Sequence, residues 1–394
     1  MSHLATTFWK GERLQEAEKL QEEVLKLRIE AFGCRHPDTI LAMTDLALTI
    51  SDSGRLEEAE KIQRKVLELK REAYGSNHPD TILAMSNLSI TFWKGGRLVE
   101  AEKLAQEVLE VKRKDLGTNH PDTVIAMSNL ASIFLTDKKF EKTEKLQQEV
   151  LEINRKTFGN NHPNTILAMN NLAVTMGDSE RFLDAEKLQQ EVLNIRREVL
   201  GNNHTDTLLA MSNLANTFWK SGRLKEAERL QEEVFQIRKK TFGDSHSKTV
   251  LAMSDLAVTI YDSGRLEEAA KIQREVLKIK RETCGNDHPD TILAKSNLAT
   301  TLWKSGILEE AVELDQEVLK IKKETFGCSH PDTISAMSSL ITTLLKSEKW
   351  KEAEELMQEV LTIQRKAPPS ESSHLDTKQS SRHYFGQSYS DNNL

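Results

Sequence analysis

The sequence contains few of the residues on which several common kinds of protein depend. Only 3 of its 394 residues are cysteine and only 8 are proline. The three cysteines have no paired metal-ligand spacing, and no stretch approaches the ~18 consecutive apolar residues of a membrane-spanning helix. A charged, apolar and cleavable leader is also missing from the start of the sequence. We therefore expect a protein of a reducing compartment, the cytoplasm in first place, with no membrane partner.

An excess of basic residues is missing as well. Lysine and arginine number 54 against 61 aspartate and glutamate residues, which gives a net charge of −7. A protein whose affinity rests on neutralising phosphates needs the opposite balance, so nucleic acid is not an expected partner. The hydrophobic fraction of 38% is too high for a chain that is disordered throughout.

What the sequence does contain is a repeat of 42 residues without insertion or deletion. A histidine marks the same place in each unit, within the pattern G-x-x-H-P-D-T. These histidines are His36, His78, His120, His162, His204, His246, His288 and His330. Met1 falls in register with Met43, so the chain opens inside a repeat. A longer period is also visible, because residues 1–156 and residues 211–366 are copies of one block.

Each unit is predicted to form two helices, which are described here for the third one. Proline suits the first helical position and aspartate suits the positive helix end, so His-Pro-Asp-Thr predicts a helix over residues 79–94. Its core side is predicted to contain Ile82, Met85, Leu88 and Phe92. Gly95 and Gly96 end it, and a second amphipathic helix runs from about residue 98 to Gly117, for which we expect an αL-type cap.

Two such helices cannot bury their apolar faces alone, so neighbouring units must stack. The predicted fold is all-α, an open right-handed superhelix of about nine two-helix repeats over residues 1–366. Residues 367–394 begin with Ala-Pro-Pro and are rich in serine, and we expect them to be a disordered tail.

The motifs N-L-A-x-T-F, Gly-Arg-Leu and E-A-E-x-L-x-x-E-V-L resemble the tetratricopeptide repeat. The 42-residue length and the His-Pro-Asp-Thr connector are similar to the variant found in kinesin light chains and nephrocystin-like arrays. The resemblance implies that the first helix of each unit lines a concave groove, and that the groove binds peptide segments of other proteins.

Two kinds of residue on the outward side of the first helices are the candidate binding residues. The first kind is an asparagine whose amide suits the backbone of an extended peptide. It occurs as Asn87, Asn129, Asn171, Asn213 and Asn297. Kinesin-light-chain-like arrays use this position for a peptide contact, so the resemblance implies the same here. The alternative is that each amide bonds the neighbouring first helix.

The second kind is a Trp-Lys pair at the end of the first helix. It occurs as Trp9-Lys10, Trp93-Lys94, Trp219-Lys220 and Trp303-Lys304. An aromatic and a cationic side chain together suit a partner segment with aromatic and acidic residues. The alternative is that the tryptophan packs over the turn and the lysine is a solvated helix end. Because the block is copied, we expect two similar sites 210 residues apart.

The repeated histidines are not predicted to bind a metal. They lie one repeat apart, about 10 Å, and cannot share an ion with bonds of ~2 Å, so helix capping or loop hydrogen bonding is expected. No nucleophile with a neighbouring base and no phosphate-binding glycine loop occurs either. We expect no enzymatic activity, no cofactor and no small-molecule substrate.

The leading hypothesis is therefore a non-enzymatic scaffold that binds partner peptide segments in its groove. The alternative is a C-terminal sensor or oligomerisation array of a larger nucleotide-switch signalling protein, since arrays with this connector often have that place. RNA reading at one base per repeat is disfavoured by the repeat length and by the acidic charge.

Overall fold

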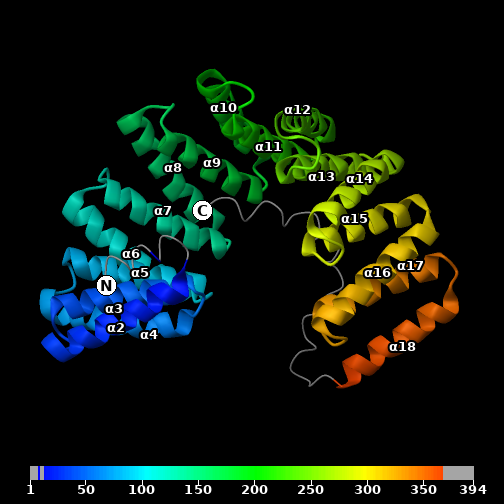
Figure 1. Cartoon of the computed structure of the whole chain (residues 1–394). Helices are drawn as coiled ribbons and strands as arrows, with labels where there is room; N and C mark the ends of the chain where they lie inside the picture. Colours follow the sequence, from blue (N-terminus) through cyan, green and yellow to red (C-terminus); the bar gives the residue numbers. More distant parts are fainter. Residues whose placement is uncertain (1–7, 9–12, 367–394) are drawn as a thin grey trace. The chain divides into compact units, whose positions relative to one another are not determined.

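A computed structural model describes Phe8 and residues 13–366, and in residues 13–366 it contains seventeen α-helices and no strand (Figure 1). The chain consists of two compact units, Met1–Ile195 and Arg196–Leu394, whose boundary falls inside α10 (Phe182–Leu200). The predicted tail, residues 367–394, lies outside the described residues, and so do Trp9 and Lys10.

The helices alternate between two kinds. Helices A follow the His-Pro connector and are α3 (Pro37–Asp52), α5 (Pro79–Lys94), α7 (Pro121–Thr136), α9 (Pro163–Asp178), α11 (Thr205–Lys220), α13 (Ser247–Asp262), α15 (Pro289–Ser305) and α17 (Pro331–Lys346). Helices B follow the short turn and are α2 (Leu14–Phe32), α4 (Leu56–Tyr74), α6 (Leu98–Leu116), α8 (Phe140–Phe158), α10, α12 (Leu224–Phe242), α14 (Leu266–Cys284), α16 (Leu308–Phe326) and α18 (Trp350–Lys366). The bounds predicted for the third unit agree with α5 and α6.

Helices A begin where the connector motif predicts. His78 is the N-cap of α5, its Nδ1 accepts a hydrogen bond of 3.2 Å from the Asp80 backbone N–H, and proline occupies the first turn. The fully buried Thr81 donates its hydroxyl to the Gly75 carbonyl oxygen at 2.8 Å. The ring of Tyr74 stacks on His78 with centroids 4.7 Å apart. The repeated connector is therefore a structural device that closes one repeat and starts the next.

The predicted αL cap at Gly117 is wrong in one respect. This glycine has φ 84° and ψ 164°, so φ is positive as expected but ψ is extended instead of near +47°. Nothing lies within 4 Å of a Cβ built at this position, so a larger side chain would meet no neighbour. Glycine is favoured here because of the positive φ. The extended ψ carries the chain away from α6 into the connector, whereas an αL residue would fold it back onto the helix end.

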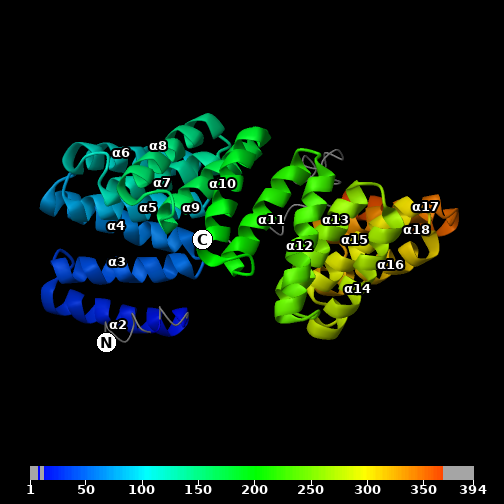
Figure 2. The same cartoon turned by 90° about the horizontal axis from the view of Figure 1, so that it is seen from above.

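Consecutive helices pack against each other within each unit, from α2 to α9 and from α11 to α18 (Figure 2). The predicted core residues of α5 are all buried, with Met85 only 1% exposed. In the second unit one cluster joins residues of α13, α14, α15 and α16, among them Val250, Leu277, Leu298 and Leu314. The predicted all-α repeat array is thus confirmed, and its core runs through the stacked helices.

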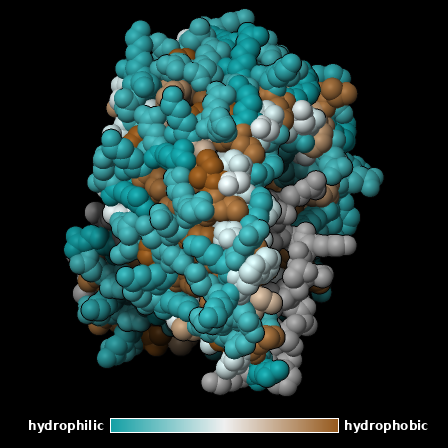
Figure 3. Space-filling view, turned by 90° about the vertical axis from the view of Figure 1, so that its right-hand side faces the viewer, coloured by the Kyte–Doolittle hydropathy of each residue, from teal (hydrophilic) through white to brown (hydrophobic). Residues whose placement is uncertain are grey.

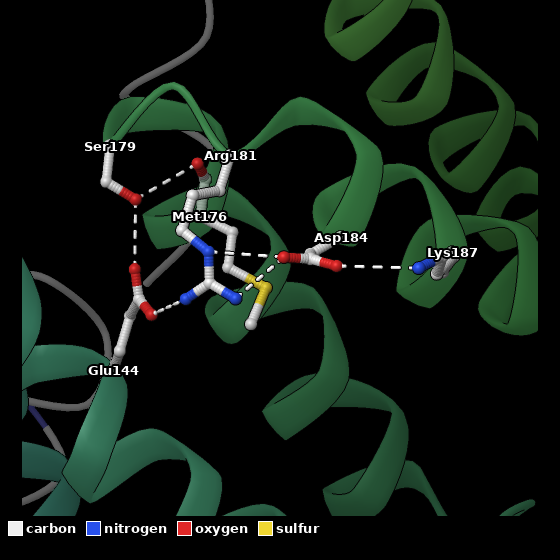
Figure 4. Close-up of polar contacts among 6 residues, drawn as sticks. All are labelled: Glu144, Met176, Ser179, Arg181, Asp184 and Lys187. Carbon is white, nitrogen blue, oxygen red and sulfur yellow. Dashed lines mark hydrogen bonds and ion pairs between the residues drawn. The ribbon is translucent and has the colours of Figure 1, made fainter.

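In five places a polar bridge joins a repeat to the one before it, and Figure 4 shows one of them. The guanidinium of Arg181, in the turn before α10, pairs with Glu144 of α8 and with Asp184 at 2.7 Å. The hydroxyl of Ser179 also donates to Glu144 at 2.9 Å. Equivalent pairs are Arg55–Glu18, Arg97–Glu60, Lys139–Glu102 and Arg265–Glu228. The Gly-Arg-Leu and E-A-E motifs are therefore fixed by contacts between repeats.

Candidate functional site

The outward side of helices A forms a surface that we call the A-helix face. In α5 it consists of Leu83, Ser86, Asn87, Ile90, Trp93 and Lys94, and none of them is buried. Leu83 is 53% exposed, although it is a large apolar residue in the first half of the helix. The equivalent exposed residues are Leu41, Ile125, Leu167, Leu209 and Leu293. This face consequently presents one apolar side chain per repeat in most repeats.

The candidate asparagines lie in the middle of this face. Asn171 is exposed, and the other four, Asn87, Asn129, Asn213 and Asn297, are half-buried. Among the described residues none of the five side-chain amides makes a hydrogen bond to a neighbouring helix A, so the alternative interpretation finds no support in these contacts. An amide that keeps its donors and its acceptor can bind a peptide backbone.

In unit 1 the Trp-Lys pair links neighbouring helices A. The Trp93 indole Nε1 donates to Thr136 Oγ1 of the next helix A at 2.7 Å. Lys94 Nζ pairs with Asp52 of the preceding helix A at 3.1 Å. The tryptophan therefore reaches forward along the array and the lysine reaches backward, which adds an inter-repeat role that the sequence did not predict.

The two pairs of unit 2 behave differently from each other. Trp219 Nε1 donates to Asp262 Oδ2 at 2.6 Å, and Lys220 is exposed at the end of α11. Trp303 Nε1 is buried but has no hydrogen-bond partner among the described residues. Lys304 Nζ lies 4.3 Å from the centroid of the Tyr261 ring. The next repeat has the same kind of contact, because Lys346 Nζ lies 4.3 Å from the centroid of the Trp303 ring.

Two candidate residues, Asn297 and Trp303, line a cavity of about 370 Å³ that we call the α15/α17 pocket. Its walls are formed by α15 and α17, and its floor by Asp315 and Val318 of α16. The other lining residues are Tyr261, Ser296, Ala299, Thr300, Lys322, Ser335, Ala336, Ser338, Ser339, Thr342 and Thr343. The volume is within the range of small ligand sites, about 300–1,000 Å³. The remaining candidates line no part of this pocket.

Asp315 is the residue of the pocket that the sequence analysis missed. It is only 8% exposed, and its Oδ2 accepts a hydrogen bond of 2.7 Å from the Thr343 hydroxyl. Burial raises the pKa of the Asp315 carboxyl to about 6, although the bond from Thr343 opposes the rise. The equivalent residues in other repeats are Gln21, Gln63, Ala105, Gln147, Gln189, Gln231, Gln273 and Met357. An alignment of the repeats at this position would have revealed the exception.

A second departure from the repeat is Lys295, which the sequence analysis also missed. Its side chain is fully buried at a position where the other full repeats have methionine, such as Met85 and Met337. Its Nζ pairs with Glu317 Oε2 at 3.0 Å, and Glu317 also pairs with Arg281 at 2.8 Å. The buried charge is thus compensated by an ion pair at the surface of helices B.

The surface of helices B is mainly charged. Figure 3, which views the molecule from the right-hand side of Figure 1, shows a mostly hydrophilic surface with smaller hydrophobic patches. On helices B the charges pair between repeats, as in Arg274–Glu310 at 2.6 Å.

No helix in the described residues is both long and apolar enough to cross a membrane. The same part of the chain contains no group of three side chains that could hold a metal ion.

Comparisons with known proteins agree with this architecture. Tetratricopeptide repeat models match residues 1–38 and residues 44–114, 122–197, 177–240, 206–282, 248–324 and 290–366. No curated protein sequence matches the chain significantly.

Several solved structures are similar to this chain. Nearly identical TPR-like repeats of a putative kinesin light chain from Podosopora anserina are 27% identical, with a TM-score of 0.49, over 53% of this chain and 99% of that chain. BtubC (BKLC) from P. vanneervenii is 20% identical over 59% and 92% of the two chains, with a TM-score of 0.49. The apo form of the quorum sensor NprR from B. thuringiensis is 11% identical over 92% and 97%, with a TM-score of 0.52.

Proposed function

Because this chain belongs to the tetratricopeptide repeat family, we propose that it is a non-enzymatic scaffold that binds segments of partner proteins along its A-helix face. The single observation that carries the proposal is the α15/α17 pocket, in which Asn297 and Trp303 come together on that face. The buried Trp303 indole N–H has no hydrogen-bond partner in the described part of the chain, and the half-buried Asn297 adds an amide. These groups suit the backbone of an extended segment.

The partner segment is proposed to contain aromatic and acidic residues. Lys304 and Lys346 lie against the rings of Tyr261 and Trp303, where neither is paired with a carboxylate among the described residues. Their charges can therefore attract acidic side chains next to the pocket. The exposed apolar side chains at the starts of helices A, such as Leu293, offer contact area for an aromatic residue.

Selection from a displayed library of random peptides on the full chain tests this function. Trp303→Ala and Asn297→Ala are the test variants, and Lys278→Ala, on an exposed position of helix B, is the matched control. Selected peptides should lose about 2 kcal/mol of binding free energy in Trp303→Ala and under about 1 kcal/mol in Lys278→Ala. Circular dichroism establishes that the variants are folded.

Enrichment of no peptide, or binding that is equally strong in Trp303→Ala and the wild-type chain, would contradict the proposed function. The alternative of a sensor array in a larger switch protein stays a prediction, because the likeness to NprR shows the fold alone.

A further inference from the structure

The carboxylate at the floor of the α15/α17 pocket has only one partner. Thr343 donates to Oδ2 of Asp315, and among the described residues no other donor or cation pairs with this side chain. A carboxylate can accept about four hydrogen bonds. A buried one that accepts a single bond is costly, and the cost is recovered when a donor with a positive charge enters.

None of the three lysines around the pocket pairs with Asp315 in the described residues. Lys322 Nζ donates to the Asp332 carbonyl oxygen at 3.4 Å, and Lys346 Nζ donates to the Trp303 carbonyl oxygen at 2.6 Å. Lys304 lies over the ring of Tyr261. Only burial and the Thr343 bond set the pKa of Asp315, so no neighbouring lysine compensates its charge.

The hydroxyl groups of the pocket add further acceptors. Ser338, Ser339 and Thr342 donate their protons to backbone carbonyl oxygens of their own helix, at 3.0, 3.3 and 2.9 Å. Ser296 and Thr300 do the same on α15, at 3.1 and 2.9 Å. A hydroxyl whose proton is used in this way presents its oxygen lone pairs to the pocket. The lining is therefore rich in acceptors, which suit an ammonium or guanidinium group.

One group of the pocket requires an acceptor instead. The buried indole N–H of Trp303 has no partner in the described residues, and an unmade bond of this kind favours a ligand that provides a carbonyl oxygen. A peptide segment with a basic side chain offers both groups, a carbonyl oxygen on its backbone and a cation at the end of the side chain.

We propose that the α15/α17 pocket binds a lysine or arginine side chain of the partner segment, with Asp315 as its counter-ion and Trp303 as a donor to the segment's backbone. The inference rests on the proposed function and names the side chain that this face selects. In the first copy of the block Ala105 and Ile133 occupy the positions of Asp315 and Thr343 and provide no charge, so the basic residue is recognised by unit 2 alone.

Short capped peptides test the pocket directly. Ac-Gly-Lys-Gly-NH2 and its arginine analogue are titrated into the full chain, with norleucine and citrulline analogues of the same length but without charge. The Trp303 indole N–H signal in NMR spectra, assigned with Trp303→Phe, reports binding. We expect the Lys and Arg peptides to shift this signal and to bind at least tenfold more tightly than their uncharged analogues.

Two variants remove the carboxylate in different ways. Asp315→Asn keeps the shape and the acceptor for Thr343, and the double variant Asp315→Ala/Thr343→Ile introduces the residues that the chain itself has at the equivalent positions, Ala105 and Ile133. Each should reduce binding of the Lys and Arg peptides at least tenfold and leave the uncharged peptides unchanged. Circular dichroism checks the fold of both.

Three outcomes would overturn the inference. Equal binding of charged and uncharged peptides would show a groove without a cation site, and the proposed function would survive. Equal binding of the Lys peptide to Asp315→Asn and the wild-type chain would exclude Asp315 as the counter-ion. Absence of binding by every capped peptide would also exclude the cation site, and the library selection then decides independently whether the scaffold function fails as well.

Discussion

The first and second copies of the duplicated block, residues 1–156 and 211–366, have matching helices from α2 and α12 onward but different polar interiors. In the first copy Met85, Ala105 and Ile133 are buried, and Trp93 donates to Thr136. In the second copy the equivalent residues are Lys295, Asp315 with Thr343, and Trp303 without an acceptor. The two sites that we expected to be similar therefore differ in this structure. The second copy has three buried polar residues at positions that are apolar in the first copy.

The difference teaches that buried polar residues change together with their partners. Ala105 and Ile133 are both apolar and buried, and both positions are polar in the second copy, where Thr343 donates to Asp315. The polar bridge between repeats shows the same joint change. Where the first copy has the pair Arg97–Glu60, the second copy has Ile307 and Ala270, so both partners are apolar. A single polar residue left in the interior would cost the desolvation of an unpaired group.

The largest expected effect separates Glu317 from Glu107, its equivalent in the first copy. Glu317→Ala leaves the buried Lys295 without its counter-ion and should cost about 3 kcal/mol of stability. Glu107→Ala removes only an exposed pair with Arg71 and should cost under about 1 kcal/mol. Chemical denaturation of both variants measures the difference.

The double variant Lys295→Met/Glu317→Ala controls for other effects of Glu317. Methionine is the residue of the other full repeats, so the double variant should recover most of the lost stability. Equal costs for the Glu317 and Glu107 variants would contradict the assigned role of Lys295.

A pH dependence distinguishes Asp315 from its apolar equivalent, Ala105. Its pKa is raised from 3.8 to about 6 in the folded chain, so the folded state binds this proton more tightly than the unfolded state. The stability that protonation contributes is complete below pH 3.8 and is lost as the pH rises through about 6. Asp315→Asn should therefore be about 3 kcal/mol more stable than the wild-type chain at pH 7, and the difference should fall below about 1 kcal/mol near pH 4.

Thermal unfolding of both proteins from pH 4 to pH 8 measures this difference. Ala105→Ser is the matched control in the first copy, because it adds a polar group that does not titrate. A stability difference between Asp315→Asn and the wild-type chain that stays constant over this range would contradict the buried, titrating carboxylate.

The two tryptophans provide a smaller contrast. Trp93→Phe removes the hydrogen bond to Thr136 and should cost about 1 kcal/mol. Trp303→Phe removes an N–H that has no acceptor among the described residues, so the change in stability should stay below about 0.5 kcal/mol. Denaturation midpoints of the two variants, measured side by side, test this contrast. A larger loss of stability in Trp303→Phe than in Trp93→Phe would contradict an unpartnered Trp303 N–H.

The smallest effect should be the same in both copies. The turn between helices A and B has a positive φ, at 73° for Gly96, but Lys138 and Glu348 occupy the same position of other repeats with φ of 55° and 61°. Lys138→Gly and Glu348→Gly should each stabilise the chain by about 0.5–1 kcal/mol, because glycine adopts this region without steric cost. Unequal melting-temperature gains would show that the copies differ at this turn too.

The repeat architecture and its helix bounds follow from the sequence because their causes are local. His78, Pro79 and Gly95 act within a few residues of themselves, and Met85, Leu88 and Phe92 lie on one side of a helix whatever surrounds it. The geometry of Gly117 was only half predicted, since a glycine indicates positive φ but not the ψ that the following connector requires.

Only the tertiary structure could decide which side chains meet across repeats. Asp315 and Thr343 lie 28 positions apart, and Trp93 and Thr136 lie 43 apart, so no helical period relates them. Their distances depend on how one helix pair packs on the next, and a cavity such as the α15/α17 pocket exists only after that packing. The sequence thus determined the unit and its outward residues, whereas the stacking of units determined which of those residues gained a partner and which, like Trp303, did not.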